Sequence, residues 1–209
     1  MKLVETKNLS MSIDKRRVLH NINLSFESYN IYGIIGDNFS GRIELLKVLS
    51  GLIREYEGEV IILGNLIRKE IGFLDRVGIS IGIEGFVGNR TGYKNLISMA
   101  SIRGIIGDED VKDALYLTGL DYNLKDKVSE YDFPMRKKLS IAQAIMEKPK
   151  VIIIDEPFMH LNGDEIKAIQ KVFKSICESR RATIILGSRR ANYINEICNE
   201  VFNIEDGKI

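Results

Sequence analysis

The chain has 209 residues, of which 44% are hydrophobic, and a formal net charge of +1. This length fits one sizeable α/β domain with room for a subdomain, and the near-neutral charge gives no indication of nucleic-acid binding. Neither a signal-like N-terminus nor an apolar run of the roughly 18 residues that span a bilayer is present, so we expect any membrane connection to run through a partner.

The N-terminal part is rich in predicted strands. Val18–Phe26 alternates apolar and polar side chains, which predicts a half-buried strand. Ile31–Ile35 is a short apolar run that predicts a buried strand, and Gly58–Gly64 predicts another strand bracketed by glycines. Arg42–Leu49 has apolar residues at helical spacing, so we expect a helix there.

A loop with the spacing of a phosphate-binding loop, G-x-x-x-x-G-K-[ST], joins this buried strand to this helix. Its residues are Gly36, Asp37, Asn38, Phe39, Ser40, Gly41, Arg42 and Ile43. In such a loop backbone N–H groups point at phosphate oxygens, and the following helix adds its positive end. Arg42 stands where the motif has lysine, and Ile43 where it has the hydroxyl that binds Mg²⁺. An ordinary strand-to-helix turn with two glycines is the alternative.

The middle of the chain, residues 85–135, changes character. Thr91–Ala100 and Asp108–Leu117 have the pattern of helices. We expect Asp108 to cap the N-terminus of the second helix and Gly119 to stop it. This part of the chain is therefore predicted to be helical.

The last part returns to an α/β pattern. Val151–Ile154 and Thr183–Leu186 are apolar runs typical of parallel strands buried on both faces, with a predicted helix between them. Asp155 and Glu156 follow the first run, at the strand end where ligands bind in open α/β sheets. An aspartate there can hold Mg²⁺ beside phosphates, and a glutamate can polarise an attacking water. A polar turn before a proline is the alternative, but together with the loop the pair predicts a nucleotide site.

At these motifs the sequence resembles the ATP-binding subunit of an ABC transporter, and the resemblance covers nearly the whole chain. YGIIGDNFSGRIELLKVLSGL is similar to the family's phosphate-loop segment. LSIAQAIMEKPKVIIIDEP is similar to the helix after its signature motif and the strand that carries the two carboxylates. GSRRANYINEICNEVFNIEDGKI is similar to its switch-histidine segment and terminal hairpin. GFVGNRTGYKNL resembles the bacitracin-resistance and lantibiotic-immunity branch, in which two such subunits drive membrane subunits that export peptides.

The resemblance implies a P-loop, ABC-type α/β fold with an N-terminal antiparallel β subdomain, a parallel-sheet core and a helical subdomain. Within a single domain, residues 1–84 and 136–209 would form the core with its β subdomain, and residues 85–135 the helical subdomain. It implies ATP and Mg²⁺ as cofactors, with Gly36–Ile43 around the phosphates, Asp155 on the metal and Glu156 as the catalytic base. It also implies a membrane subunit and a second ATP-binding subunit as partners, no nucleic acid, and a place on the cytoplasmic face of a membrane.

Several positions that contact nucleotide in the family are changed here. Besides Arg42 and Ile43, Ile13 stands in place of an aromatic that stacks on adenine, and Gly82 in place of a glutamine that senses the γ-phosphate, with Glu84 close by. Asp132 and Pro134 replace a serine and a glycine in the signature segment Tyr131–Met135. Asn162 replaces an aspartate, and Arg189 replaces the switch histidine. Family members bind ATP between the phosphate loop of one subunit and the signature motif of the other. Asp132 would bring a carboxylate towards phosphate and Pro134 removes an N–H donor, so both composite sites are affected.

Three functions follow as hypotheses. The first is an ATP-binding subunit for peptide or antibiotic export or immunity, with weak or no hydrolysis although Glu156 is present. The second is a non-hydrolysing structural or regulatory subunit that docks on an intact partner. The third is another P-loop protein such as a nucleotide kinase, which predicts an intact lysine and an acceptor-binding lid that the sequence does not show. A shifted chemistry in which Arg42 clamps the phosphate stays open.

Other polar residues receive plainer interpretations. Cys177 and Cys198 are expected to be structural thiols in a reducing cytoplasm. Arg136–Lys138 is expected to be a solvated helix face, and Arg189–Arg190 either a surface pair or a pair that approaches phosphate. Four residues are either a docking surface for a membrane subunit or part of a helical core: Phe86, Val87, Tyr93 and Leu96.

Overall fold

The structure, a computed structural model, describes residues 1–67, 75–82 and 85–209. In chain order its elements are β1 (Lys2–Ile13), β2 (Arg16–Glu27), β3 (Ile31–Ile35), α1 (Arg42–Leu49), β4 (Glu57–Ile62), β5 (Asn65–Leu66), β6 (Val77–Ser80), α2 (Gly92–Arg103), α3 (Asp108–Leu117), the 3-10 turn η1 (Val128–Glu130), α4 (Phe133–Met146), β7 (Val151–Asp155), α5 (Gly163–Arg180), β8 (Thr183–Ser188), α6 (Asn192–Asn195) and β9 (Glu200–Asn203). Among the described helices, none is both long and apolar enough to cross a membrane.

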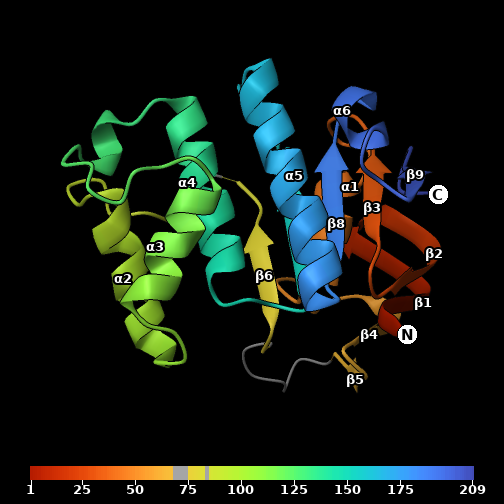
Figure 1. Ribbon diagram of the computed structural model, residues 1–209. Coiled ribbons are helices and arrows are strands. Elements are labelled where there is room, and N and C mark those ends of the chain that lie inside the picture. The colour runs from red at the N-terminus through yellow and green to blue at the C-terminus, as the bar shows by residue number, and fades with distance from the viewer. Residues whose placement is uncertain (68–74, 83–84) are drawn as a thin grey trace.

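Two sheets organise the chain (Figure 1). One is antiparallel, with strand order β2-β1-β4-β5, and the other has the order β6-β7-β8-β3-β9 with parallel neighbours throughout. Helix α1 contributes its buried leucines and Val48 to the apolar core that the antiparallel sheet shares with one face of the parallel sheet. The antiparallel β part and the parallel-sheet core that the sequence led us to expect are both present.

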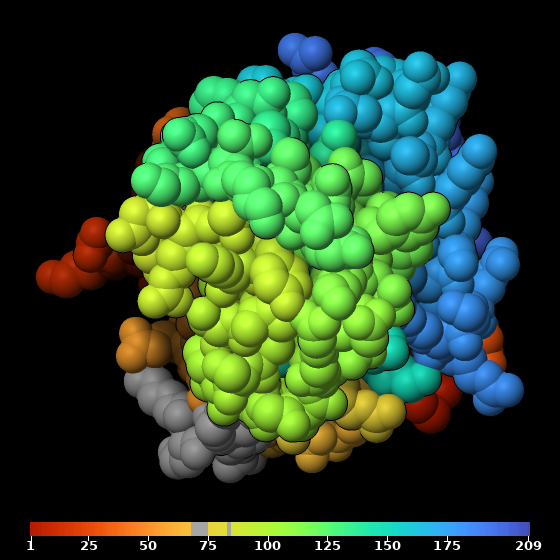
Figure 2. Space-filling view, turned by 60° about the vertical axis from the view of Figure 1, so that its left-hand side comes forward, coloured from red at the N-terminus to blue at the C-terminus, as the bar shows by residue number. Residues whose placement is uncertain are grey.

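Strand β7, which lies between β6 and β8 in the parallel sheet, shows why an uninterrupted apolar run was needed. Val151 and Ile153 pack into the core shared with α1, whereas Ile152 and Ile154 pack into a second core under helices α2 to α5. Successive side chains of a strand point to opposite faces, so a strand covered on both faces must be apolar at every position. Figure 2 shows the outer side of this second layer, where the helical segment forms a continuous surface.

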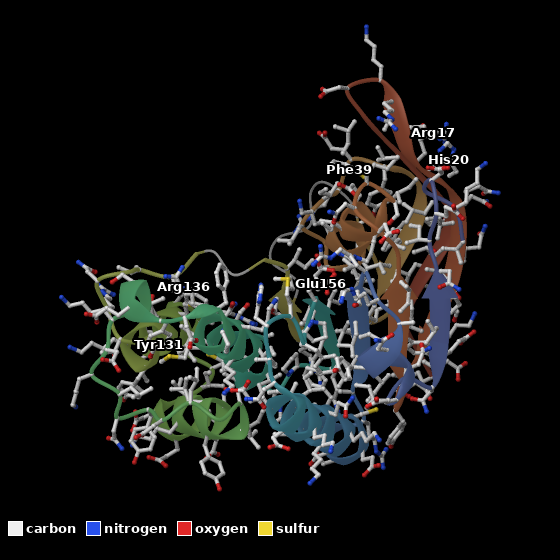
Figure 3. All side chains as sticks on the ribbon, turned by 90° about the horizontal axis from the view of Figure 1, so that it is seen from above. Arg17, His20, Phe39, Tyr131, Arg136 and Glu156 are labelled. Atoms are coloured by element: carbon white, nitrogen blue, oxygen red, sulfur yellow. The ribbon has the colours of Figure 1, made fainter. Side chains whose placement is uncertain are left out.

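Viewed from above, the molecule has two arms that meet at an angle (Figure 3). Tyr131 and Arg136 lie in the helical arm, Phe39 lies on the arm built on the antiparallel sheet, and Glu156 lies near the corner where the arms meet. The corner is formed by the carboxyl ends of the parallel strands, the edge at which such sheets bind ligands.

Two details of the helical arm differ from expectation or decide an open alternative. Gly107, not Asp108, is the N-cap of α3, because the Asp110 carboxylate accepts the Gly107 N–H at 3.0 Å and closes the first turn. Leu96 is fully buried in the helical core, with Phe86 and Tyr93 packed against it, so Leu96 belongs to the core. The subdomain boundaries proposed from the sequence stay a prediction.

Candidate functional site

The site forms where β3, β7 and β8 end side by side. Gly36 N–H donates to Ser188 O (3.0 Å) and Glu156 N–H donates to Gly187 O (2.8 Å), so hydrogen bonds continue just beyond the strands. The register of β7 and β8 pairs Asp155 with Gly187. The loop after β3 and the two carboxylates at the end of β7, far apart in sequence, therefore meet at one edge of the sheet.

The phosphate-loop segment is held by its neighbours as well as by its glycines. Gly41 has a left-handed backbone (φ 95°), and a Cβ there would lie 2.7 Å from Val18 O, so only glycine fits. Ser40 O accepts the Gly207 N–H at 2.8 Å, and Gly207 O accepts the His20 N–H at 2.8 Å. A distant turn and strand β2 thus fix the shape of the loop from behind.

The tip of the loop points into solvent. Asp37, Asn38 and Phe39 are exposed, Phe39 to 99%, and Phe39 has a left-handed backbone with φ 67°. Gly36 at the start of the loop has no room for a side chain, because a Cβ would lie 2.4 Å from Ser40 Oγ. The curled backbone that a phosphate cradle requires is therefore present, with a strained aromatic at its tip.

Arg42 turns inward, towards the carboxylates. It is 2% exposed, and its Nη1 donates to Gly36 O at 2.9 Å and to Glu156 Oε1 at 3.1 Å. Its Nη2 donates to Asp155 Oδ2 at 3.4 Å, and its Nε lies 3.1 Å from Asp155 Oδ1, close enough for an ion pair but not aligned for a hydrogen bond. The planar fork of the guanidinium thus contacts the loop backbone and both carboxylates at once.

Glu156 is capped by N–H groups on a single oxygen. Its Oε1 accepts from Arg42 Nη1 (3.1 Å), the Arg189 backbone N–H (2.8 Å) and Arg189 Nε (3.1 Å). Its backbone is left-handed, with φ 49°, a conformation that is strained for a residue other than glycine. Arg189 therefore contacts the carboxylate and is not a plain surface residue.

Lys137 belongs to the site, although we expected Arg136–Lys138 to be a solvated helix face. Lys137 is 2% exposed, its Nζ donates to Asp155 O at 3.1 Å, and burial lowers its pKa. Its position in α4 explains this, because Lys137 shares a helix face with the buried Ser140, Ile141 and Ala144. That periodicity was the available sequence signal, and the positive charges of the run obscured it.

Gly187 is a second residue that sequence reasoning missed. A Cβ there would lie 2.6 Å from Asp155 Oδ1 and 3.5 Å from Arg42 Cδ, so the absent side chain makes room for the ion pair. Burial raises the pKa of Asp155, while the adjacent Arg42 opposes that rise. No sequence motif pointed to this position, because its role depends on the pairing of β7 with β8.

The remaining positions singled out in the sequence lie away from this cluster or have structural roles. Ile13 is exposed at the end of β1, and Gly82 O accepts a hydrogen bond from Ser140 Oγ. Asp132 and Asn162 are the N-caps of α4 and α5, and each accepts backbone N–H groups of its own helix. Glu84 lies outside the described residues.

The residues present fit a phosphate group better than they fit a metal ion. The curled loop and the start of α1 offer backbone N–H groups, as a phosphate requires. Ile43 has no oxygen, and Asp155 already contacts Arg42 through both of its carboxylate oxygens. Mg²⁺ needs near-octahedral oxygen ligands at about 2.0–2.1 Å, so this donor set does not fit it as it stands.

Comparison with known proteins decides the family. Residues 19–159 match the family described as ABC transporter. The chain belongs to that family. The protein YybJ of Bacillus subtilis (strain 168), described as an uncharacterized ABC transporter ATP-binding protein, is 34% identical over 209 residues, which cover 99% of this chain and 94% of YybJ. The chain is therefore an ATP-binding subunit of an ABC transporter, and the alternative of a nucleotide kinase is wrong.

Further relatives of this ABC subunit carry more specific descriptions. The bacitracin transport ATP-binding protein BcrA of Bacillus licheniformis is 28% identical, over 99% of this chain and 68% of BcrA. The lantibiotic transport ATP-binding protein SrtF of Streptococcus pyogenes is 26% identical, over 99% of this chain and 89% of SrtF. The resemblance to the bacitracin and lantibiotic branch is thus confirmed at the level of relatedness.

Solved structures agree on the fold. The dimeric cassette MJ0796 bound to ADP and phosphate superposes with a TM-score of 0.90 at 19% identity, covering 99% of this chain and 96% of that one. The CbiO1 protein of Clostridium perfringens, part of the CbiONQ transporter complex, gives a TM-score of 0.80 at 20% identity, with coverage of 99% and 86%. ATP-binding subunits of this family dimerise and pair with membrane subunits, as the resemblance implied.

Proposed function

We propose that this ABC subunit serves a transporter for peptide or antibiotic export or immunity and that it hydrolyses ATP weakly or not at all. The relatedness to BcrA and SrtF supports the class of cargo. The observation that carries the loss of hydrolysis is the capping of Glu156, whose Oε1 already accepts from Arg42 and twice from Arg189. The second oxygen, Oε2, accepts from Ser188 Oγ at 3.4 Å, so contacts on both oxygens hold the carboxylate in place and hinder its turning towards an attacking water as a general base.

The signature side of the site supports the same proposal. The Asp132 carboxylate accepts the Met135 N–H at 2.8 Å and so caps α4 with its own negative charge. Pro134, in the first turn, has no N–H to offer. The phosphates of a nucleotide bound to the partner's phosphate loop would meet the Asp132 carboxylate at the N-terminus of α4, the helix end where an anion otherwise binds. This chain would supply the signature segment to the nucleotide site on its partner's phosphate loop. That site therefore stays altered even when the partner's own residues are intact.

The test is steady-state ATP turnover by the chain with its membrane and ATP-binding partners, next to the matched variant Glu156→Gln. In a working ATPase this substitution removes the base and lowers turnover by about 100-fold or more. Here we expect turnover near background and no further loss in the variant. Robust turnover that Glu156→Gln abolishes would overturn the proposal.

A structural or regulatory subunit that docks on an intact partner is the second candidate, and the same contacts favour it. Nucleotide binding separates the two functions. A ligand at about 100 times its Kd stabilises a fold by about 2.7 kcal/mol, which raises the melting temperature measurably. Stabilisation by ATP supports a nucleotide-binding subunit, and its absence together with intact complex formation supports the structural one. Val87, in the segment expected to dock on a membrane subunit, is exposed. It is therefore the residue to substitute when complex formation is measured.

A further inference from the structure

The arginine of the phosphate loop occupies the space between the loop and the carboxylates. Arg42 reaches Gly36 O on one side and Asp155 and Glu156 on the other, over distances of 2.9 to 3.4 Å. This is the place in which a cation bridges phosphate and carboxylate in a nucleotide site. The guanidinium is therefore a positive charge covalently attached at the position of a bound cation.

The surroundings are built around this side chain. Arg42 is 2% exposed, and the absence of a Cβ at Gly187 leaves room for Asp155 Oδ1, which such a Cβ would approach to 2.6 Å. Ile43, next in the chain, lacks the hydroxyl that would complete a metal site. Two other positions, Gly187 and Ile43, thus agree in accommodating the pair of Arg42 with Asp155 and in disfavouring a divalent ion.

The charge balance points the same way. Lys137 and Arg189 join Arg42 around Asp155 and Glu156, so the cluster has one more positive than negative charge. A divalent cation added to this cluster would meet three cations at short range and find both carboxylates already engaged. An anion, by contrast, would meet a net positive charge and the N–H groups of the loop.

We propose that Arg42 is a resident cation that replaces Mg²⁺, so that this site takes a nucleoside triphosphate without metal. The proposal rests on the proposed function only in taking the loop as the nucleotide site. In this proposal Arg42 neutralises the negative charges of Asp155 and Glu156, as Mg²⁺ does for the carboxylates of other nucleotide sites. The loop backbone supplies the contact with the phosphates.

The test compares the affinity of the full chain for ATP in excess EDTA and in millimolar Mg²⁺, by calorimetry and by thermal shift. For the wild-type chain we expect dissociation constants that agree within about twofold. The variant Arg42→Lys/Ile43→Ser frees the carboxylates and restores a hydroxyl, so its affinity for ATP should fall at least tenfold when EDTA replaces Mg²⁺. Binding of Mn²⁺ by the same variant, seen as loss of the free-ion signal in electron paramagnetic resonance, should exceed that of the wild-type chain. Arg16→Lys, an exposed change of the same kind on β2, is the matched control and should behave as wild type.

Each outcome decides the proposal. A wild-type affinity for ATP that falls by more than about twofold in EDTA would overturn it, and so would the absence of ATP binding in both buffers. Because the wild-type comparison requires no substitution, a variant that fails to fold does not remove the test. Metal-dependent binding without turnover would refute the resident cation and leave the proposed function standing. Robust metal-dependent turnover would refute the loss of hydrolysis as well.

Discussion

Removing the Arg42 guanidinium should destabilise the fold substantially. Arg42→Met keeps an unbranched stem but leaves Asp155, 8% exposed, without the charge that lies 3.1 Å away. Breaking a buried ion pair from one side costs about 3–5 kcal/mol. Lys137 and Arg189 still contact the cluster, so we expect the lower end, about 3 kcal/mol. In a domain of this size that corresponds to a fall in Tm of about 6–12 °C.

The loss should depend on pH with a definite sign. Burial already raises the pKa of Asp155, and loss of Arg42, which opposes that rise, would raise it further. A carboxyl whose pKa is higher in the folded state binds a proton there that the unfolded chain has released, so stability is lost as pH rises through the folded-state pKa. The deficit of Arg42→Met should therefore be largest at pH 8. It should shrink as pH falls towards the ordinary aspartate value of about 3.9.

The assay is guanidinium-induced unfolding, followed by circular dichroism at pH 8 and pH 5. Arg16→Met, an exposed arginine on β2, is the control and should change the free energy of unfolding by less than about 0.5 kcal/mol. Arg42→Met/Asp155→Asn/Glu156→Gln removes the charges together and should recover most of the loss. A deficit for Arg42→Met below about 1 kcal/mol at pH 8, or one equal at both pH values, would refute the reasoning.

Three further predictions concern other parts of the molecule. Phe39→Gly should stabilise the chain by about 0.5 kcal/mol in chemical unfolding, because a left-handed backbone is unfavourable for an exposed phenylalanine; a loss would show that the ring packs. Asp132→Ala removes the cap that binds the Met135 N–H and should lower Tm by about 2–4 °C in calorimetry, with Asp132→Asn as a near-neutral control. Burial raises the pKa of the Cys198 thiol to about 12 and also raises the pKa of Cys177. Both thiols should therefore react with a disulfide reagent at pH 8 far more slowly in the folded chain than in the unfolded chain. Equal rates in the two states would contradict this burial.

Features encoded over short stretches of sequence could be predicted. Helix bounds at Arg42–Leu49 and Asp108–Leu117 follow from apolar spacing, and the structure confirms both. A strand at Val151–Ile154 followed by two carboxylates was predicted because a doubly covered strand must be apolar throughout, and the structure has this strand at Val151–Asp155. The curl of Gly36 to Gly41 follows from steric limits that only glycine escapes.

Features that depend on contacts between distant segments could not be predicted. The position of the Asp155 carboxylate beside Arg42 requires the room left by Gly187, and the role of Lys137 requires α4 to pack over the end of β7. The sequence assigned Asp155 to a metal and left Arg42 as a lysine substitute. The structure shows the two side chains paired with each other. Glu156 was likewise expected to face water, and its capping by Arg189 depends on how β8 ends.

The hydrogen bond from Gly207 N–H to Ser40 O, together with the one from His20 N–H to Gly207 O, has a consequence for the order of folding. The loop is complete in the sequence at Ile43, yet its backing turn and the neighbouring strand β9 come from residues 200–207. During synthesis the loop therefore lacks this support until residues 200–207 have emerged from the ribosome. Contacts of such long sequence separation slow folding. The region with the clearest motif is thus expected to acquire its native shape only after residues 200–207 are in place.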